Sequence, residues 1–167
     1  LYALKKIMSD LENRGIVIET EKNKNSEELK KFNHSYYQGL LIIIGNMKGL
    51  STFIPNQDKN KQFYDNRLLG EMRSLSSLPL YSYDELVQRS STIDVIWFNE
   101  RLMPHTFFEI EHSTDIQNSL LKFYDLQDFY SRMIIVADEK RKYEFDSKYS
   151  YVAFKELNQN QRVSFLN

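Results

Sequence analysis

The sequence predicts an α/β domain in which helices flank a mixed β-sheet. Two runs rich in β-branched and aromatic residues, 92–98 and 106–111, lie a few residues apart and predict an antiparallel hairpin. An amphipathic stretch at 114–130 then leads to the uninterrupted apolar run 133–137, which is typical of a strand covered on both faces. A hairpin followed by a helical crossover to such a strand places antiparallel and parallel neighbours in one sheet.

The composition is that of one folded domain with room for a small appendage. Of the 167 residues 41% are hydrophobic, 27% are charged and only 5 are glycine, which argues against a disordered or fibrous protein. The absence of cysteine excludes disulfides and thiol chemistry and fits a reducing, cytoplasmic location. The longest apolar runs, 40–44 and 133–137, are too short to span a bilayer, and no basic-then-apolar leader opens the sequence. We therefore expect no membrane partner.

Residues 1–33 are expected to form an N-terminal helical extension, followed by a core domain at 34–167. Apolar residues recur at helical spacing before Gly15, which is a typical helix stop. A short β run and a charged linker then lead into the core domain. A helix that packs on the core is the favoured interpretation, and the tail of a winged-helix module is the alternative.

The first half of the core domain is predicted to hold one strand among several helices. Gly45 or Gly49 ends the first helix, and Pro55 stops the strand that follows it. Ser82 and Glu85 have the spacing of a capping box, in which each side chain bonds the other residue's backbone N–H at a helix start. The expected elements are helix 34–46, strand 50–54, turn 56–60, helix 67–75 and helix 82–89.

The second half is predicted to hold the hairpin, the crossover helix and two further strands. Thr114 and Gln117 have the capping-box spacing, and the apolar residues that follow recur at helical intervals. The expected elements are strand 92–98, strand 106–111, helix 114–130, strand 133–137, a charged tip at 138–142 and a last strand near 151–154.

Three acids stand inside the apolar runs of the predicted hairpin. Asp94 lies in the first run, and Glu109 and Glu111 lie in the second. A symmetric hairpin register pairs Asp94 with Glu109, and alternate residues of a strand share a face, so all three acids point the same way. The opposite face is uniformly apolar, which supports this register; it comprises Ile93, Val95, Trp97, Phe108 and Ile110, and the same register pairs Ile96 with Phe107 and Phe98 with His105.

Carboxylates placed this close need a positive charge or a proton. Opposed side chains in a hairpin start about 5 Å apart, and two carboxylates at that distance repel by about 3 kcal/mol at an effective dielectric constant near 20. Oxygen ligands of this kind suit Mg²⁺ or Mn²⁺. We therefore interpret Asp94, Glu109 and Glu111 as a metal site, with ordinary surface carboxylates as the alternative.

The pattern Ile93-Asp94 followed by Phe108-Glu109-Ile110-Glu111 resembles the PD-(D/E)XK nuclease superfamily. The order of elements from residue 34 is also similar to the αβββαβ core of its restriction-endonuclease-like fold. The resemblance implies a Mg²⁺-dependent (or Mn²⁺-dependent) DNA endonuclease of restriction or defence type, which hydrolyses phosphodiester bonds with a metal-activated water. Asp94 and Glu109 would be the metal ligands, and Glu111 is expected to join them.

The sequence departs from the family pattern at position 111, where the family usually has lysine. Glu111 could ligate the metal or position water, and Lys122 in the following helix could supply the missing charge. For Lys122 itself, an exposed lysine paired with Asp125 is the favoured interpretation, and the role in the site is the alternative. Gln38 lies in the first helix, where the family often places an acid, and either acts through a metal-bound water or is simply buried. His112 should point to the face opposite Glu111 and pack as a structural residue.

Two basic tips are candidates for contacts with DNA phosphates, with plain solvated loops as the alternative. The net charge of −1 lacks the basic excess of many nucleic-acid binders, but an acidic metal site can offset such tips. Their residues are Lys59, Lys61, Lys140, Arg141 and Lys142.

Three function classes remain open at this point. The first is the metal-dependent endonuclease, for which a homodimer is one way to cut both DNA strands. The second is a catalytically silent DNA-binding module on the same scaffold, for which the glutamate at position 111 leaves room. The third is a metal-independent glycosidase that uses two carboxylates, and it ranks last because nothing in the sequence requires a sugar groove.

Overall fold

The structure is a computed structural model, and it describes residues 26–63 and 66–167. The helix, strand and linker expected before residue 26 therefore lie almost entirely outside the described residues. No helix within the described part of the chain is long and apolar enough to cross a membrane.

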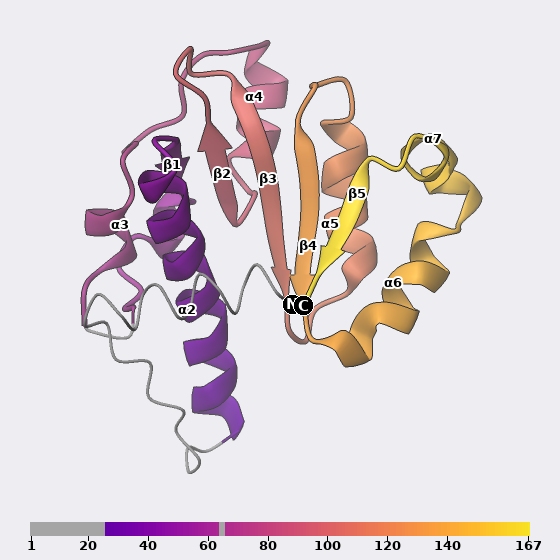
Figure 1. Cartoon of the computed structure of the whole chain (residues 1–167), viewed down its shortest axis with the longest axis horizontal. Coiled ribbons are helices and arrows are strands. Elements are labelled where there is room, and N and C mark those ends of the chain that lie inside the picture. Colours follow the sequence, from indigo (N-terminus) through magenta and orange to yellow (C-terminus); the bar gives the residue numbers. More distant parts are fainter. Residues whose placement is uncertain (1–25, 64–65) are drawn as a thin grey trace.

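A five-stranded mixed sheet forms the centre of the molecule, with the strands side by side in chain order (Figure 1). The first three strands are antiparallel neighbours, whereas the last two continue the sheet in parallel, as expected after helical crossovers. This confirms the predicted fold class, and the element order is compatible with the restriction-endonuclease-like core. The strands are β1 (Ser51–Phe53), β2 (Val95–Phe98), β3 (Pro104–Glu111), β4 (Arg132–Ala137) and β5 (Val163–Leu166).

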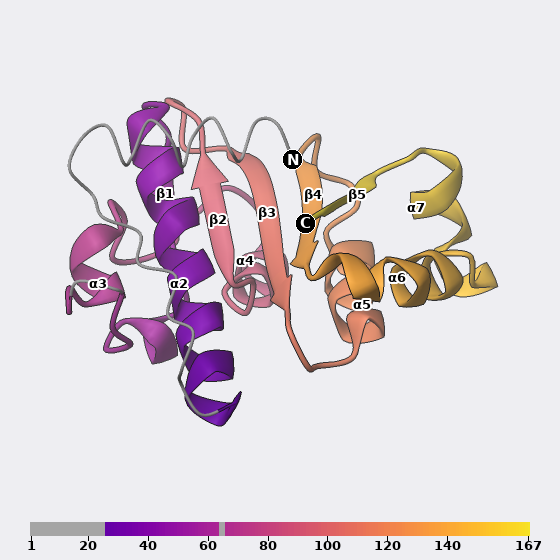
Figure 2. The same cartoon turned by 60° about the horizontal axis from the view of Figure 1, so that its bottom comes forward.

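Helices cover both faces of the sheet (Figures 1 and 2). Helix α2 (Ser26–Met47) packs against β1, β2 and β3 on one face. The other face carries α5 (Ile116–Asp125), with α4 (Asp84–Ser90) and α6 (Lys142–Tyr149) as its neighbours. The short helices α3 (Leu69–Met72) and α7 (Lys155–Gln159) lie in the segments after β1 and before β5.

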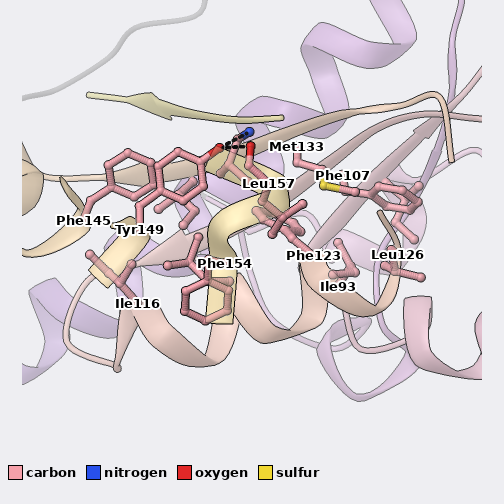
Figure 3. Close-up of a cluster of buried hydrophobic side chains, with 14 of the residues drawn as sticks. Ile93, Phe107, Ile116, Phe123, Leu126, Met133, Phe145, Tyr149, Phe154 and Leu157 are labelled. Atoms are coloured by element: carbon pink, nitrogen blue, oxygen red, sulfur yellow. Dashed lines mark hydrogen bonds between the residues drawn. The ribbon is translucent and has the colours of Figure 1, made fainter. Parts of the chain in front are cut away.

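Each face of the sheet has its own apolar core. The core under α5 holds Ile96 and Phe107 from the hairpin together with Phe123 of α5, and Figure 3 shows how Phe145, Tyr149 and Phe154 extend it toward α6. The core under α2 is built on the alternate strand residues, among them Val95, Trp97, Phe108 and Ile110. Strand β4 contributes to both cores, which confirms that it is covered on both faces.

Helix α2 is longer than the sequence predicted. It begins at Ser26 rather than near residue 34, and it ends at Met47, two residues before Gly49, whose φ of 73° suits a glycine. The helix therefore includes part of the charged stretch that was expected to form a linker. The helix runs across the expected boundary at 33/34, and the division into extension and core stays a prediction.

The hairpin has the predicted register over most of its length. Ile96 pairs with Phe107, as expected. The prediction was wrong for Phe98, which pairs with Pro104 instead of His105 because a bulge shifts the register after Trp97. Since the bulge lies toward the turn, it leaves the end of the hairpin that carries the acids in the predicted alignment.

Both predicted capping boxes are wrong, and so is the predicted end of the crossover helix. Helix α4 begins after Tyr83, without a side-chain cap. The cap of α5 is Asp115, whose side chain accepts from the backbone N–H of Gln117, because Thr114 is engaged with Glu111. The helix ends at Asp125, before residue 130.

The chain after β4 differs most from the prediction. The charged tip is a 3-10 turn, Glu139–Arg141, that continues directly into α6. The strand expected near 151–154 is a second 3-10 turn, Val152–Phe154, in which Phe154 is buried while Val152 is 88% exposed. The last strand is β5, further along the chain, so the predicted position was wrong.

Candidate functional site

Asp94, Glu109 and Glu111 line one cavity of about 360 Å³, at the edge where β2 begins and β3 ends. Helix α2 contributes His34 to the wall, and helix α5 contributes Ser119 and Lys122; the loop before α5 adds Ser113 and Thr114. The structure therefore brings the three predicted acids together, with a histidine and a lysine beside them.

Asp94 and Glu109 are joined through the backbone at the start of the hairpin. The backbone N–H of Asp94 donates to Oε1 of Glu109 at 3.2 Å, and Oδ2 of Asp94 accepts from the backbone N–H of Ile110 at 2.8 Å. These bonds hold the side chain of Asp94 beside the end of β3. The expected position of Ile93 on the face opposite the acids was wrong: Ile93 packs under α5, because the chain bends at 93–94 before strand alternation begins.

Glu109 is a buried carboxylate, with only 2% of its surface exposed. Burial, reinforced by the charge of Asp94, raises the pKa of Glu109 to about 8, although Lys122 and Ser119 act in the opposite direction. The ammonium of Lys122 donates to both carboxylate oxygens, at 2.8 and 3.0 Å, and the hydroxyl of Ser119 donates to Oε2 at 3.0 Å. Glu109 therefore lies between a like charge and an opposite charge, and it binds either a proton or a cation readily.

Lys122 is directed into the cavity and does not pair with Asp125. Its ammonium also donates to the carbonyl of Thr92 at 2.9 Å, whereas Asp125 pairs with Arg89 at 2.5 Å. Ser119 and Lys122 are three residues apart on α5, so the same face of that helix presents both to the acids. The interpretation of Lys122 as an exposed partner of Asp125 was therefore wrong.

Glu111 is held by donors of the protein itself. One of its carboxylate oxygens accepts from the hydroxyl of Ser119, and the other accepts from the hydroxyl of Thr114. The guanidinium of Arg141 lies 3.9 Å from the second oxygen. The hydroxyl of Ser119 lies within hydrogen-bonding distance of both Glu109 and Glu111, and because it has one proton it donates to one of them at a time.

The donor set of the cavity fits a divalent cation held by two carboxylates. Mg²⁺ commonly takes one or two protein carboxylates and completes its octahedron with water and substrate phosphate. Asp94 and Glu109 match that requirement. Within residues 26–63 and 66–167, no group of three or more histidine and acidic side chains is arranged to hold a metal ion. Glu111 as a third ligand stays a prediction.

Two side chains of α2, His34 and Gln38, contact Asp94. Nε2 of His34 lies 3.4 Å from Oδ2 of Asp94, and the amide of Gln38 donates to the backbone carbonyl of Asp94 at 3.2 Å. Gln38 is fully buried and is not part of the cavity wall, so it contacts the backbone of Asp94 rather than the space where a metal would bind. Burial lowers the pKa of His34, but the hydrogen bond and charge of Asp94 outweigh this effect and raise it overall.

The sequence analysis did not identify His34 as a site residue. The available signal was its spacing, because His34 precedes Gln38 by four residues and falls on the same face of a helix. The ring of His112 packs against Tyr37 of α2, with 5.3 Å between centroids, which confirms the expected facing of His112. His112 also borders the cavity.

One residue of each basic tip lies near a residue of this cavity: Lys61 near His34, and Arg141 near Glu111. Lys61 pairs with Asp58 at 2.7 Å, and its charge lowers the pKa of nearby His34; Lys59 beside it is exposed. At the other tip, the guanidinium of Arg141 turns inward to Glu144 and to the carbonyl of Thr114. The role of Arg141 as a contact with DNA phosphate stays a prediction. Lys140 is exposed, and Lys142 pairs with Asp146 and lies over the ring of Phe145.

A family model and a curated relative both relate the chain to the same type II restriction enzyme. The family model of the type II restriction enzyme NmeDI C-terminal domain matches residues 16–167. Type II restriction enzyme NmeDI of Neisseria meningitidis serogroup C is 34% identical over 122 residues, which cover 66% of this chain and 34% of that enzyme. The chain thus spans about a third of the length of this relative. No solved structure gave a significant match.

Proposed function

The chain belongs to the family of the type II restriction enzyme NmeDI C-terminal domain, and on this premise we propose that it is a DNA-cutting domain of restriction or defence type. Its substrate would be the phosphodiester backbone of double-stranded DNA, and its working location the cytoplasm. The chemistry we propose is that of the PD-(D/E)XK nucleases, with Mg²⁺ (or Mn²⁺) as the cofactor.

One observation carries this proposal: two neighbouring carboxylates of the hairpin share a cavity with a lysine of the following helix. In the proposed resemblance to the PD-(D/E)XK nucleases, Asp94 and Glu109 correspond to the two acids of the motif. Glu111 stands where the family usually has lysine, and the ammonium of Lys122 lies 2.8 Å from the carboxylate of Glu109. A lysine that has moved from the strand to the helix supplies the same charge at the same carboxylate.

The residues of the cavity would have different roles in phosphodiester hydrolysis. Asp94 and Glu109 would hold the divalent cation, which supplies Lewis-acid chemistry and lowers the pKa of a water. Lys122 orients the attacking water and stabilises negative charge that develops on the phosphoryl oxygens. Glu111 acts through Ser119, whose hydroxyl touches both glutamates, and so keeps Glu109 facing the cavity.

The exposed lysines of the two tips are the proposed contacts with DNA phosphates. Lys61 lies near His34 of the cavity, and we propose that a duplex with one phosphate at the carboxylates brings neighbouring phosphates to Lys59, Lys61 and Lys140. Arg141 contributes less, because its side chain is only 16% exposed and is bound to Glu144. Lys142 is exposed but paired with Asp146, as Lys61 is with Asp58, and is a further candidate contact. Cutting both strands requires a second site, and a homodimer related by a two-fold axis would provide it.

Cleavage of supercoiled plasmid in the presence of Mg²⁺ or Mn²⁺ tests the proposal. We expect the wild-type protein to nick and linearise the plasmid, and Asp94→Ala to abolish this activity. Asp125→Ala is the matched control, because Asp125 pairs with Arg89 outside the cavity. Equal activity of wild type and Asp94→Ala would reject the proposed site.

A catalytically silent DNA-binding module is the second candidate, and the glutamate at position 111 is the observation that favours it. Such a module would bind DNA but leave the plasmid intact at every metal concentration. Gel-shift binding without cleavage, by a protein that takes up no Mn²⁺, would decide for this candidate.

A further inference from the structure

A line of contacts connects the Lys61 tip with the backbone of Asp94. The ammonium of Lys61 lies 2.7 Å from Oδ1 of Asp58, and Oδ2 of Asp58 accepts from the amide nitrogen of Gln38 at 2.8 Å. The same nitrogen donates to the carbonyl of Asp94 at 3.2 Å. One amide group therefore joins a carboxylate of the loop to the residue proposed as a metal ligand.

Of the residues that make these contacts, Gln38 and Asp58 are buried and Lys61 is exposed. Gln38 is fully buried and Asp58 is 4% exposed, whereas the side chain of Lys61 is 45% exposed. A buried carboxylate is costly unless it is paired and hydrogen-bonded, and Lys61 and Gln38 together meet that need for Asp58. The orientation of the Gln38 amide is thus set by Asp58, and the charge of Asp58 is balanced by an exposed lysine.

The segment that follows Asp58 contacts helix α2 next to Gln38, through Phe63 and Gly39. The ring of Phe63 fills the space beside Gly39, where a Cβ atom would lie 2.2 Å from the ring. The residue before this glycine is Gln38. The segment that carries Phe63 therefore packs directly against α2 next to the amide of Gln38.

Helix α2 contacts Asp94 at two separate groups. His34 lies beside the carboxylate, and Gln38, one turn later, bonds the backbone carbonyl. Contacts to both ends of one residue restrict its rotation as well as its position. Such contacts matter for a metal ligand, because the residues that hydrogen-bond to a ligand determine its orientation toward the metal.

We propose that Gln38 is a positioning residue for Asp94, and that the Lys61–Asp58 ion pair keeps Gln38 in the orientation that this requires. The inference rests on the proposed function, because it takes Asp94 as a metal ligand. It gives Lys61 a second role besides contact with DNA: Lys61 acts on the cutting step through Asp58 and Gln38.

The two roles of Lys61 predict different kinetics. A lysine that only contacts a DNA phosphate contributes to affinity and to its salt dependence, so its loss raises KM and leaves kcat unchanged. A lysine that also holds Asp94 in place through the buried amide lowers kcat when it is removed. This loss of kcat should not occur in a protein that already lacks the Gln38 amide.

The experiment compares Gln38→Met, Lys61→Met and the double variant in the full chain. Methionine has nearly the volume of glutamine but neither donates nor accepts a comparable bond. We measure kcat and KM for DNA cleavage, Mn²⁺ affinity by calorimetry without DNA, and thermal unfolding to confirm that every variant is folded at the assay temperature. Gln57→Met is the matched control, because Gln57 is an exposed neighbour of Asp58.

We expect Gln38→Met to lower kcat and Mn²⁺ affinity by roughly 10- to 100-fold, the usual effect of removing a partner of a metal ligand. Lys61→Met should lower kcat by a smaller factor in the wild-type background and by none in the Gln38→Met background. Gln57→Met should match the wild type. If Gln38→Met does not fold, Asp58→Asn replaces it: the new amide oxygen still accepts from Gln38, but the charge that pairs with Lys61 is gone, so kcat should fall as in Lys61→Met.

Two results would overturn the inference. The first is wild-type kcat and Mn²⁺ affinity in Gln38→Met. The second is a Lys61→Met effect that is confined to KM, or one on kcat that is as large in the Gln38→Met background as in the wild type. Failure of the proposed function itself is recognised separately, because the wild-type protein would then neither cut DNA nor bind Mn²⁺.

Discussion

Glu109 is the residue whose ionisation governs the site. Burial and the charge of Asp94 raise its pKa to about 8, so the carboxyl group carries a proton over much of the neutral range. A divalent cation must displace that proton. We therefore predict that Mn²⁺ affinity rises about tenfold per pH unit between pH 6 and pH 8 and levels off above.

Calorimetry in buffers of different ionisation enthalpy measures both the affinity and the proton released. Glu109→Gln should bind Mn²⁺ weakly, with a smaller dependence on pH in this range, because only His34 beside Asp94 still titrates there. An affinity of the wild-type protein that is constant from pH 6 to pH 8 would contradict the role given to Glu109.

Glu111 should matter for the structure of the site more than for metal binding. Both of its carboxylate oxygens accept from hydroxyls, and Arg141 lies close by. We predict that Glu111→Gln keeps Mn²⁺ affinity close to wild type and lowers the free energy of unfolding by about 1–3 kcal/mol, because an amide cannot satisfy the same donors. Calorimetry and urea denaturation measure the two effects. Loss of Mn²⁺ binding as complete as in Asp94→Ala would instead make Glu111 a ligand.

Individual site residues could be predicted from the sequence where they conflict with their surroundings. Asp94, Glu109 and Glu111 interrupt apolar strands, and this conflict identifies them without any structure. Lys122 and His34 produce no such conflict, because a lysine or a histidine on an amphipathic helix is ordinary. Their roles depend on which face of each helix packs on the sheet, which is decided by contacts between segments distant in sequence.

At the scale of elements, α5 is the helix that presents Ser119 and Lys122 to the acids. Its first turn is capped by Asp115, which also pairs with Lys148; this bond to Lys148 is the main cause of the lowered pKa of Asp115. We predict that Asp115→Ala lowers the free energy of unfolding by about 1 kcal/mol, as expected for loss of a helix cap. Chemical denaturation measures the change.

Asp115→Asn separates the cap from the ion pair. Asparagine retains the oxygen that accepts from the backbone but loses the charge that attracts Lys148, and an exposed ion pair contributes little. The asparagine variant should therefore be nearly as stable as wild type. If it is as unstable as the alanine variant, the ion pair and not the cap stabilises the start of α5.

The elements that the sequence predicts well are those with a strong hydrophobic pattern. The hairpin, β4 and α5 have regular periodicity because each faces a core. Helix α6 has only two buried residues, Phe145 and Tyr149, and the short edge strand β5 has one, Val163. With so few buried residues, neither element shows a hydrophobic periodicity in the sequence. The run at 151–154 has β-forming residues, but its burial follows the path of the chain and not its propensity.

At the scale of the whole molecule, the charge distribution matters more than the net charge of −1. The exposed lysines lie on two tips that each have a residue near the acidic cavity, and each phosphate contact releases counterions when DNA binds. We predict that DNA binding weakens with salt, and that Lys59→Ala and Lys140→Ala each reduce the slope of log affinity against log salt concentration by about one unit.

Fluorescence anisotropy with a short duplex at several salt concentrations measures these slopes. Gln57→Met, which removes no charge, should keep the wild-type slope. Slopes that are the same in the wild type and in both lysine variants would exclude the tips as DNA contacts.

The fold of the whole molecule follows from the order of its elements. A hairpin, a crossover helix and a buried strand lead to a mixed sheet with helices on both faces, and this much is predictable because few topologies accept that order. The closeness of the two basic tips to the acids is not predictable in the same way. It depends on how the segments after β1 and β4 fold back toward one end of the sheet.

Anomalous diffraction from crystals soaked in Mn²⁺ tests the central claim most directly. The account predicts one strong peak between the carboxylates of Asp94 and Glu109, with both residues as ligands. A peak elsewhere, or none at this pair while Mn²⁺ binds in solution, would contradict it.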